Sequence, residues 1–509
     1  MEERHNNKRI IRNTVMLYVR MLFNVAISLI TSRLILNALG VEDYGIYNVV
    51  GGIVVLFTFL NSAMASSTQR FLTFELGKDE PENLNKIFST SVLIHFAISL
   101  IIFFLAETVG LWLFYNKLII PVDRLEAAMW VFQLSVLSCI VSILSVPYNA
   151  SIIAREKMDT FAYISILDIF LRFLVVVLLY FVEGDRLVLY AFLLFMISLL
   201  IRSVLMLYCR RNFDETHFHV AWNKKLFFEM SNFAGWNLFG NMAYVGYTQG
   251  VNILLNIFFG PSVNAARAIV VQVQSTLNNF CNSFQSAVNP QITKSYASGD
   301  REYMLNLLLA SSKYSFFLLL FMALPILIES QQILTLWLKV VPDHTAAFLR
   351  IILLVAMVDA LANPLITTAQ ATGKIRDYQV FVGGALLLIV PISYISLKMG
   401  GSPESVFIVH LVIVILAQIM RLFMLRSLVD ISLSSYFMKV VCPITRVSIL
   451  SPIIPLIIFH EMDDSLLRLF AIVFTACFSV LFWGYVEGLE KKEKDFIKGK
   501  LNLLKERYL

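Results

Sequence analysis

Long apolar segments recur from one end of the chain to the other and are separated by short polar links. Examples are the runs at 93–105, 187–200, 314–328 and 466–482. A helix needs roughly 20 mostly apolar residues to cross the hydrocarbon core of a bilayer, so the pattern predicts an all-α integral membrane protein. Allowing about 35 residues for a helix and its link predicts about fourteen transmembrane helices. We place them at 11–38, 45–70, 87–114, 123–151, 158–182, 187–209, 226–257, 262–290, 304–328, 344–370, 376–398, 403–427, 438–460 and 464–488.

The distribution of charge predicts the orientation in the membrane. Lys and Arg are more numerous in the links expected inside, such as those around Arg155 and Lys294, than in the links expected outside. This asymmetry and an even number of helices place both termini in the cytoplasm. The first apolar stretch continues for a full span and carries Arg20, so we expect a retained helix rather than a cleaved signal peptide. The basic tail suits lipid headgroups better than nucleic acid.

The two halves of the chain share a weak repeat. LNALG at 36–40 corresponds to LNIFFG at 255–260, and the Pro-containing segment from Val146 corresponds to the segment from Asn363. We expect an N-terminal lobe of helices 1–6 at 1–212, a C-terminal lobe of helices 7–12 at 213–430, helices 13–14 at 431–490 and a cytoplasmic tail at 491–509. Such parallel repeats usually bind substrate at a central cavity between the lobes, here expected to form a V, and alternate access by rocking.

Polar residues follow single faces of the first helices of each half, and polar side chains avoid lipid. The stripes are Arg20, Asn24, Ser28 and Thr31 in the first helix, Asn237, Asn241, Tyr244, Thr248 and Asn252 in the seventh, and Asn264, Arg267, Gln274, Asn278, Asn282 and Gln285 in the eighth. Hydrogen bonding between helices explains any single member. The stripes together predict the walls of a polar cavity.

The charges on these faces are cationic: Arg20, Arg33 and Arg267. A guanidinium in a low-dielectric cavity is costly without an anion, and arginine suits bidentate capture of phosphate. We therefore expect an anionic substrate, such as a phosphate or diphosphate, bound by these arginines with Asn24, Asn241, Asn252, Gln274 and Asn278. An internal ion pair is the alternative, and Glu42 and Asp43 lie close enough in sequence to serve Arg33.

Three further charged residues in the spans are candidates for ion coupling. Asp168 and Arg172 are four residues apart, so they either neutralise each other within one helix or take part in coupling. Asp359, near Asn363, is a candidate proton or sodium site. Lys313 is expected to snorkel or to bond between helices. The five cysteines are scattered and form no metal-ligand pair, and neither a catalytic group nor a cofactor is expected.

The segments TSRLILNALGVEDYGIYNVVGGI (31–53) and STQRFLTFELGKDE (67–80) resemble the polysaccharide and O-antigen flippases of the multidrug/oligosaccharidyl-lipid/polysaccharide exporter (MOP) superfamily. The feature that carries the resemblance is Leu39, Gly40, Tyr44, Gly45 and Val49. The resemblance implies movement of an undecaprenyl-diphosphate-linked oligosaccharide from the inner to the outer leaflet of the bacterial cytoplasmic membrane. It also implies partners: membrane lipids, a polysaccharide polymerase and glycosyltransferases. The cationic cavity of the family would map to Arg20, Arg33 and Arg267.

Other functions remain open. A small-molecule exporter of the same superfamily would favour acidic cavity residues for cationic drugs, and a flippase for a lipid-linked peptidoglycan precursor would need similar chemistry. A membrane glycosyltransferase or polymerase is the rival from another class, since Glu42 and Asp43 resemble a catalytic acidic pair, but the longest outer link is too short for a folded site. The chain contains no GxxxxGK[ST] motif, so ATP hydrolysis is not expected.

Overall fold

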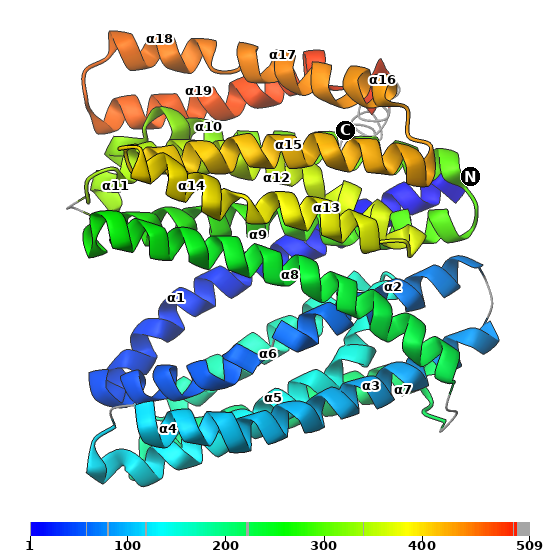
Figure 1. Cartoon of the computed structure of the whole chain (residues 1–509), viewed down its shortest axis with the longest axis vertical. Coiled ribbons are helices and arrows are strands. Elements are labelled where there is room, and N and C mark those ends of the chain that lie inside the picture. Colours follow the sequence, from blue (N-terminus) through cyan, green and yellow to red (C-terminus); the bar gives the residue numbers. More distant parts are fainter. Residues whose placement is uncertain are drawn as a thin grey trace, which may run out of the picture. The chain divides into compact units, whose positions relative to one another are not determined.

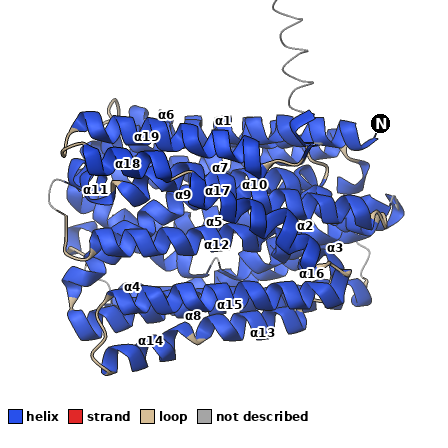
Figure 2. Cartoon of the chain, turned by 90° about the horizontal axis from the view of Figure 1, so that it is seen from above, coloured by secondary structure: helices blue, strands red, loops and turns tan. Residues whose placement is uncertain are grey.

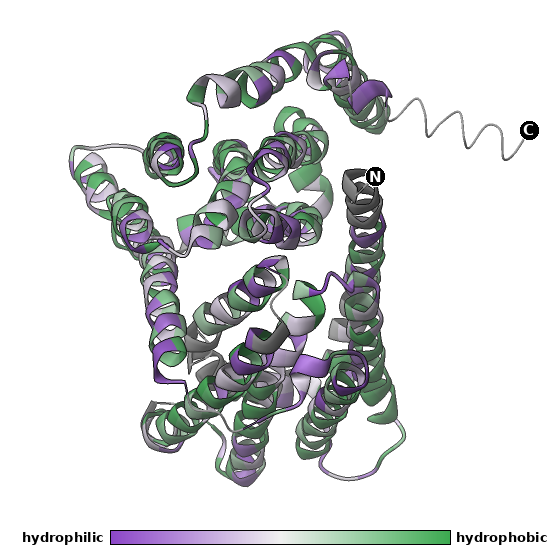
Figure 3. Cartoon of the chain, turned by 90° about the vertical axis from the view of Figure 1, so that its right-hand side faces the viewer, coloured by the Kyte–Doolittle hydropathy of each residue, from purple (hydrophilic) through white to green (hydrophobic). Residues whose placement is uncertain are grey.

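The computed structural model describes residues 2–57, 59–78, 81–117, 120–219, 223–338, 341–491 and 493–495. Within these ranges the chain is almost entirely helical, with short loops between helices, and no strand occurs among the described residues (Figures 1 and 2). Hydrophobic residues cover most of the helices (Figure 3). Backbone groups that face lipid must be satisfied within the segment, and apolar helices of this length meet that requirement.

The chain folds into two compact units. Unit 1 comprises Met1–Asn241 and Ser286–Asp300, and unit 2 comprises Met242–Gln285 and Arg301–Leu509. The helix α8 (Lys224–Phe259) therefore begins in unit 1 and ends in unit 2, whereas α9 (Pro261–Ala297) runs back the other way. The lobes predicted from the repeat, divided at 212/213 and 430/431, are a division by helix count and stay a prediction.

Unit 1 contains the first seven helices. They are α1 (Glu2–Phe57), α2 (Phe59–Lys78), α3 (Pro81–Leu105), α4 (Leu111–Lys117), α5 (Leu125–Ala154), α6 (Met158–Leu178) and α7 (Arg186–Asn212). A π-helical turn at Ala106–Gly110 joins α3 to α4. One apolar core packs α5 against α3, α4 and α7, and a second holds the beginning of α8 through Met230 and Ala234.

Unit 2 contains the later helices. They are α10 (Arg301–Ile328), α11 (Ser330–Leu338), α12 (Thr345–Thr372), α13 (Arg376–Leu387), α14 (Ile389–Lys398), α15 (Glu404–Val429), α16 (Leu433–Tyr436), α17 (Cys442–Leu450), α18 (Ile453–Glu461) and α19 (Leu466–Trp483). The apolar windows of α10 and α12 are each 61% buried, whereas that of α6 in unit 1 is 17% buried. These two helices therefore form the centre of unit 2.

Ten helical segments among the described residues are long and apolar enough to cross a membrane, judged by length and composition. They correspond to predicted helices three to six and nine to fourteen. The first, second, seventh and eighth predicted helices are also helical, in α1, α2, α8 and α9, but they are not among these ten segments. These are the helices that carry the polar stripes. The count of fourteen crossings stays a prediction.

The predicted helix boundaries agree with the structure to within a few residues in most places. The short helix α11 was not predicted, because nine residues are too few to give a clear periodic signal. The break predicted after the first helix occurs at Gly40, inside α1, where φ is 78° and ψ is 169°. That backbone conformation is open to almost no residue but glycine.

Backbone features support the internal repeat. Gly260 follows the end of α8 with a positive φ of 80°, and Gly40 interrupts α1 in the first half with a similar φ of 78°. Pro147 lies inside α5 and Pro364 lies at the equivalent place inside α12. Four residues beyond each proline, a hydroxyl (Ser151 or Thr368) donates to the proline carbonyl, at 3.0 and 2.8 Å. These hydroxyl contacts thus lie at equivalent places in the two halves.

Candidate functional site

Arg267 is the cation whose surroundings the structure defines best. It lies half-buried on α9 and donates from Nη2 to the carbonyl of Thr248 at 2.9 Å and from Nη1 to Oδ1 of Asn252 at 3.3 Å. Asn264 donates to the same Asn252 side chain at 3.2 Å. The helices α8 and α9 reverse direction at Gly260, and this reversal brings Thr248 and Asn252 of α8 opposite Asn264 and Arg267 of α9 within unit 2.

The partners of Arg267 are neutral oxygens. Among the described residues no carboxylate forms an ion pair with it, and a guanidinium has five N–H donors, of which these contacts use two. A cation at this depth is expensive without a counter-charge. The arrangement can therefore bind an anion while Thr248 and Asn252 fix the orientation of the guanidinium.

Gln274 and Asn278 lie half-buried on the same face of α9 as Arg267, seven and eleven residues further along. Tyr244 of α8 is 58% exposed, and its ring lies 5.4 Å from that of Tyr247. Hydroxyl and amide groups thus line this face next to the guanidinium. Such groups can hydrogen-bond to sugar hydroxyls.

Arg20 lies on α1 in unit 1, half-buried, with its guanidinium carbon 4.9 Å from the centre of the Phe161 ring of α6. No ion pair of Arg20 occurs within the described part of the chain. Asn24 is exposed one turn further along α1. Asn241, at the end of unit 1 on α8, donates to the hydroxyl of Ser62 at 3.4 Å. The side chain of Arg33 lies outside the described residues, so its predicted role stays a prediction.

The structure thus brings together Arg267 and Asn252 of the predicted site, with Asn264 of the same polar stripe beside them. Arg20, Asn24 and Asn241 belong to unit 1, whereas Arg267, Asn252, Gln274 and Asn278 belong to unit 2. The prediction that the two groups share one cavity stays a prediction.

The ion-coupling candidates have different surroundings. Arg172 donates from Nε to Oδ1 of Asp168 at 2.9 Å, so these two side chains neutralise each other along α6. Asp359 lies half-buried on α12, with Arg421 of α15 as its charged neighbour. Arg421 itself is buried and donates to the hydroxyl of Tyr378 at 3.1 Å. Lys313 does not snorkel: its side chain is 3% exposed and pairs with Glu493 at 2.8 Å.

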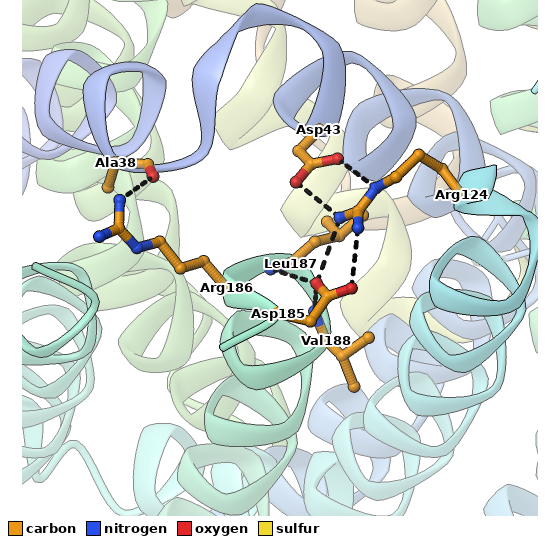
Figure 4. A network of polar contacts seen from close by, with 7 residues as sticks. All are labelled: Ala38, Asp43, Arg124, Asp185, Arg186, Leu187 and Val188. Carbon is orange, nitrogen blue, oxygen red and sulfur yellow. Dashed lines mark hydrogen bonds and ion pairs between the residues drawn. The ribbon is translucent and has the colours of Figure 1, made fainter. Parts of the chain in front are cut away.

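A polar network closes the end of unit 1 that contains Gly40, here named the Gly40 end (Figure 4). Arg124 lies between two carboxylates, at 2.7 Å from Asp43 and 2.9 Å from Asp185. Arg186 donates to the carbonyl of Ala38 at 3.2 Å. The side chain of Asp185 also accepts from the amides of Leu187 and Val188, at 3.0 and 3.2 Å, and so caps α7. Asp43 is therefore neutralised, which weakens the comparison with a catalytic acidic pair.

Two further carboxylates escaped the sequence analysis. Glu107 lies in the π-helical turn after α3 and accepts from Gln133 at 3.4 Å. Glu156 follows α5 and has a side chain that is 0% exposed. Glu156 lies between Arg155 and Lys157, and the sequence analysis used the basic residues of this link only to predict the orientation in the membrane. A positive φ on a non-glycine residue, 56° at Glu156, is a feature that only the structure supplies.

Comparisons with known proteins find similarity at the level of structure. No family model matches the chain, and no curated protein matches its sequence. Solved structures do match over most of the chain. One is an outward-facing multidrug-resistance MATE family transporter of the MOP superfamily, with a TM-score of 0.73, 12% identity, and coverage of 84% of this chain and 96% of that one.

Two further structures are similar. The MATE transporter ClbM, in complex with Rb⁺, gives a TM-score of 0.69, 16% identity, and coverage of 85% and 96%. A MOP superfamily transporter from Pyrococcus furiosus, described as having a binding pocket of reversed polarity, gives a TM-score of 0.69, 12% identity, and coverage of 83% and 96%. At these identities the likeness establishes the architecture alone: the chain has the all-helical fold of the MATE transporters of the MOP superfamily.

Proposed function

We propose that this protein is a flippase that moves an undecaprenyl-diphosphate-linked oligosaccharide from the inner to the outer leaflet of the bacterial cytoplasmic membrane by alternating access. Both termini would lie in the cytoplasm. The fold supports membrane transport by analogy with its structural neighbours. The substrate class is argued from the residues below.

The observation that carries the proposal is the uncompensated charge of Arg267. Its hydrogen bonds to Thr248 and Asn252 leave the positive charge without a counter-ion among the described residues. A diphosphate headgroup supplies that counter-ion and suits the planar guanidinium. A cationic drug would instead be repelled, so the charge favours an anionic substrate.

The remaining features fit a large amphipathic substrate. Gln274 and Asn278 offer amides for a saccharide on the face of α9 that carries Arg267, and Tyr244 offers a ring and a hydroxyl nearby. In unit 1, Arg20 gives a second cation beside Phe161. The lipid tail would stay in the bilayer while the headgroup crosses. Membrane lipids, a polymerase and glycosyltransferases that make or consume the repeat unit are the proposed partners.

The experiment is a leaflet-accessibility assay in proteoliposomes with a lipid-linked oligosaccharide. We expect Arg267→Ala to lower translocation at least tenfold. Arg267→Lys should retain part of the activity, because lysine keeps the positive charge but lacks the planar, bidentate donors of the guanidinium. Arg446→Ala is the matched control. Arg446 lies in unit 2, is 56% exposed and pairs with Glu487 at 3.0 Å, so its loss should leave translocation unchanged.

Wild-type translocation by Arg267→Ala would overturn the role of the arginine. Transport of a lipid-linked peptidoglycan precursor or of a small molecule, with no movement of the oligosaccharide, would assign the chain to another exporter of the same superfamily. Glycosyl transfer without translocation would favour an enzyme. Labelling from each side of the membrane at engineered sites near either end of the described chain tests the proposed topology.

A further inference from the structure

The last turns of α9 belong to unit 1, and the carboxylate of Glu156 makes two of the polar contacts that hold them there. These turns, Ser286–Asp300, are here named the strap, and the end of unit 1 that receives them is named the Asn13 end. The rest of α9 belongs to unit 2. Any motion of one unit against the other must therefore bend α9 or detach the strap.

Glu156 lies at the centre of the attachment. Its Oε1 accepts from Nζ of Lys294 at 2.6 Å, and its Oε2 accepts from Nε2 of Gln291. Asn13 of α1 donates to the backbone carbonyl of Glu156 at 3.1 Å. One carboxylate that is 0% exposed thus holds two successive turns of the strap, while α1 fixes the backbone that carries it.

The backbone at Glu156 indicates that a carboxylate is retained there at a cost. Its φ is 56°, in the left-handed region that glycine prefers. The equivalent position in the second half, at the same spacing as Pro147 and Pro364, is Gly373, with φ 76°. Glycine thus satisfies this turn in unit 2. Strain of this kind persists where the surroundings impose it and often marks a switch.

A second contact is independent of charge. At Gly77 of α2, a Cβ would lie 2.5 Å from the carbonyl oxygen of Lys294 and 2.9 Å from its Cα. The two helices can approach this closely because residue 77 has no side chain. Beside it, the ring of Phe74 lies 6.3 Å from that of Tyr296, and Ala287 packs between Leu17 and Met158.

The beginning of α8, which crosses between the units in the other direction, is attached differently. Met230 and Ala234 belong to a large apolar core of unit 1, and the hydroxyl of Ser67 donates to the carbonyl of Met230. An apolar attachment has no single residue on which it depends. The strap has apolar contacts too, at Ala287 and Tyr296. It differs from α8 because two of its contacts depend on single residues, the carboxylate of Glu156 and the missing side chain of Gly77, so one substitution can loosen it.

We propose that Glu156 is a latch that holds the strap in unit 1, and that breaking its contacts with Lys294 and Gln291 is a step of the transport cycle. This inference rests on the proposed function only because it assumes that the protein has a transport cycle. It does not depend on the identity of the substrate.

The test measures access to position 287. Ala287 is 0% exposed. Ala287→Cys, in the full-length chain with its five native cysteines replaced by alanine, should react slowly with N-ethylmaleimide. Adding Glu156→Ala should raise the rate at least tenfold. Gly77→Ala should also raise it, because a methyl group at residue 77 forces the strap away and leaves the carboxylate intact. An unchanged rate in both variants would overturn the latch.

Two controls separate detachment from unfolding. Gly235→Ala places a methyl group on the unit 1 part of α8 where nothing lies within 4 Å, so it should leave the rate unchanged. Ala128→Cys reports on a core of unit 1 distant in sequence from the strap, where Ala128 is 0% exposed. If Glu156→Ala also makes Ala128→Cys reactive, the Glu156→Ala protein has unfolded. The labelling rate of the Gly77→Ala protein then decides whether the latch exists.

The translocation assay distinguishes the two proposals. If the latch holds, Glu156→Ala should reduce translocation at least tenfold together with faster labelling. If the variants are labelled faster but the wild-type protein moves no lipid-linked oligosaccharide, the latch is supported and the proposed function is overturned. If the wild-type protein does translocate the lipid but labelling stays slow in every variant, only the latch is overturned.

Discussion

The two ends of unit 1 use the same chemistry in different surroundings. At the Gly40 end, Arg124 joins Asp43 and Asp185, and the three side chains are 23%, 19% and 36% exposed. At the Asn13 end, Glu156 is 0% exposed and binds Lys294, which is 20% exposed. Exposed pairs contribute little because water competes for both partners. A buried charge that loses its partner is costly.

The difference in burial is accompanied by a difference in connection. Arg124 precedes α5 and Asp185 precedes α7, and Arg124 joins both to Asp43 in the part of α1 that follows Gly40. All three helices belong to unit 1. Glu156 holds the end of a helix whose other part belongs to unit 2. The exposed network therefore reinforces a permanent arrangement, whereas the buried one controls an attachment that can be broken.

Replacing Glu156 should have the largest effect. Glu156→Ala leaves the ammonium of Lys294 without its carboxylate and the amide of Gln291 without its acceptor, and we expect a destabilisation of about 3–5 kcal/mol. Thermal unfolding in detergent measures it. Glu156→Gly should lose less, by about 1 kcal/mol, because glycine accepts the positive φ. Equal losses in the two variants would mean that the backbone at residue 156 is unstrained.

Gly40→Ala should be next. The conformation at Gly40, φ 78° and ψ 169°, excludes a Cβ at a cost of about 1–3 kcal/mol. Gly235→Ala is the matched control, because neither position has an atom within 4 Å of the added methyl group. In its helix, Gly235→Ala should stabilise by up to about 1 kcal/mol. Similar effects at the two sites would show that the kink in α1 does not require glycine.

Arg124→Ala should cost about 1 kcal/mol, since the network that it joins is partly exposed. Its effect should decrease as salt is added, whereas the effect of Glu156→Ala should change little because buried pairs are screened less. Unfolding at low and high ionic strength measures both. A salt-independent loss at Arg124 would contradict the distinction drawn between the two ends of unit 1.

The smallest expected effect is a pH dependence at the Gly40 end. Partial burial raises the pKa of Asp185, but hydrogen bonds from Arg124 and from the amides of Val188 and Leu187 outweigh it, so the pKa falls below its usual 3.8. A carboxyl with a lowered folded-state pKa stabilises the protein above pH 3.8, and this contribution disappears as the pH falls through the folded-state pKa. Asp185→Asn should flatten the stability profile below pH 4, and an unaltered profile would contradict the assignment.

The helices could be predicted from the sequence because lipid imposes a simple rule. Segments such as 187–209 and 464–488 have to be apolar over a full span, and α7 and α19 follow them closely. The repeat was visible in Pro147 and Pro364 for a similar reason, since proline has the same local consequence wherever it occurs in a helix. The kinked and polar helices also lie at the expected places, and their membrane crossings stay a prediction.

The candidate site was predicted only in part. Arg267 and Asn252 were identified because they lie on facing stripes of two consecutive helices, a relation that helical periodicity supplies. Glu156 was missed because its importance lies in a partner 138 residues away, and no pattern in the chain predicts that pairing. For Lys313 the sequence left open whether the side chain snorkels or bonds to another segment, and the structure shows the second, with a partner 180 residues further along at Glu493.

The sequence by itself determined that the chain is a bundle of apolar helices, where most of those helices begin and end, and which faces are polar. These properties depend on each segment and on its solvent. Only the tertiary structure decided which partner neutralises each charge. Asp43 and Glu156 are both carboxylates near a break or an end of a helix, and they differ in their partners, Arg124 and Lys294, and in how deeply they are buried. The burial of a charge, and hence its energetic weight, is a property of the assembled helices.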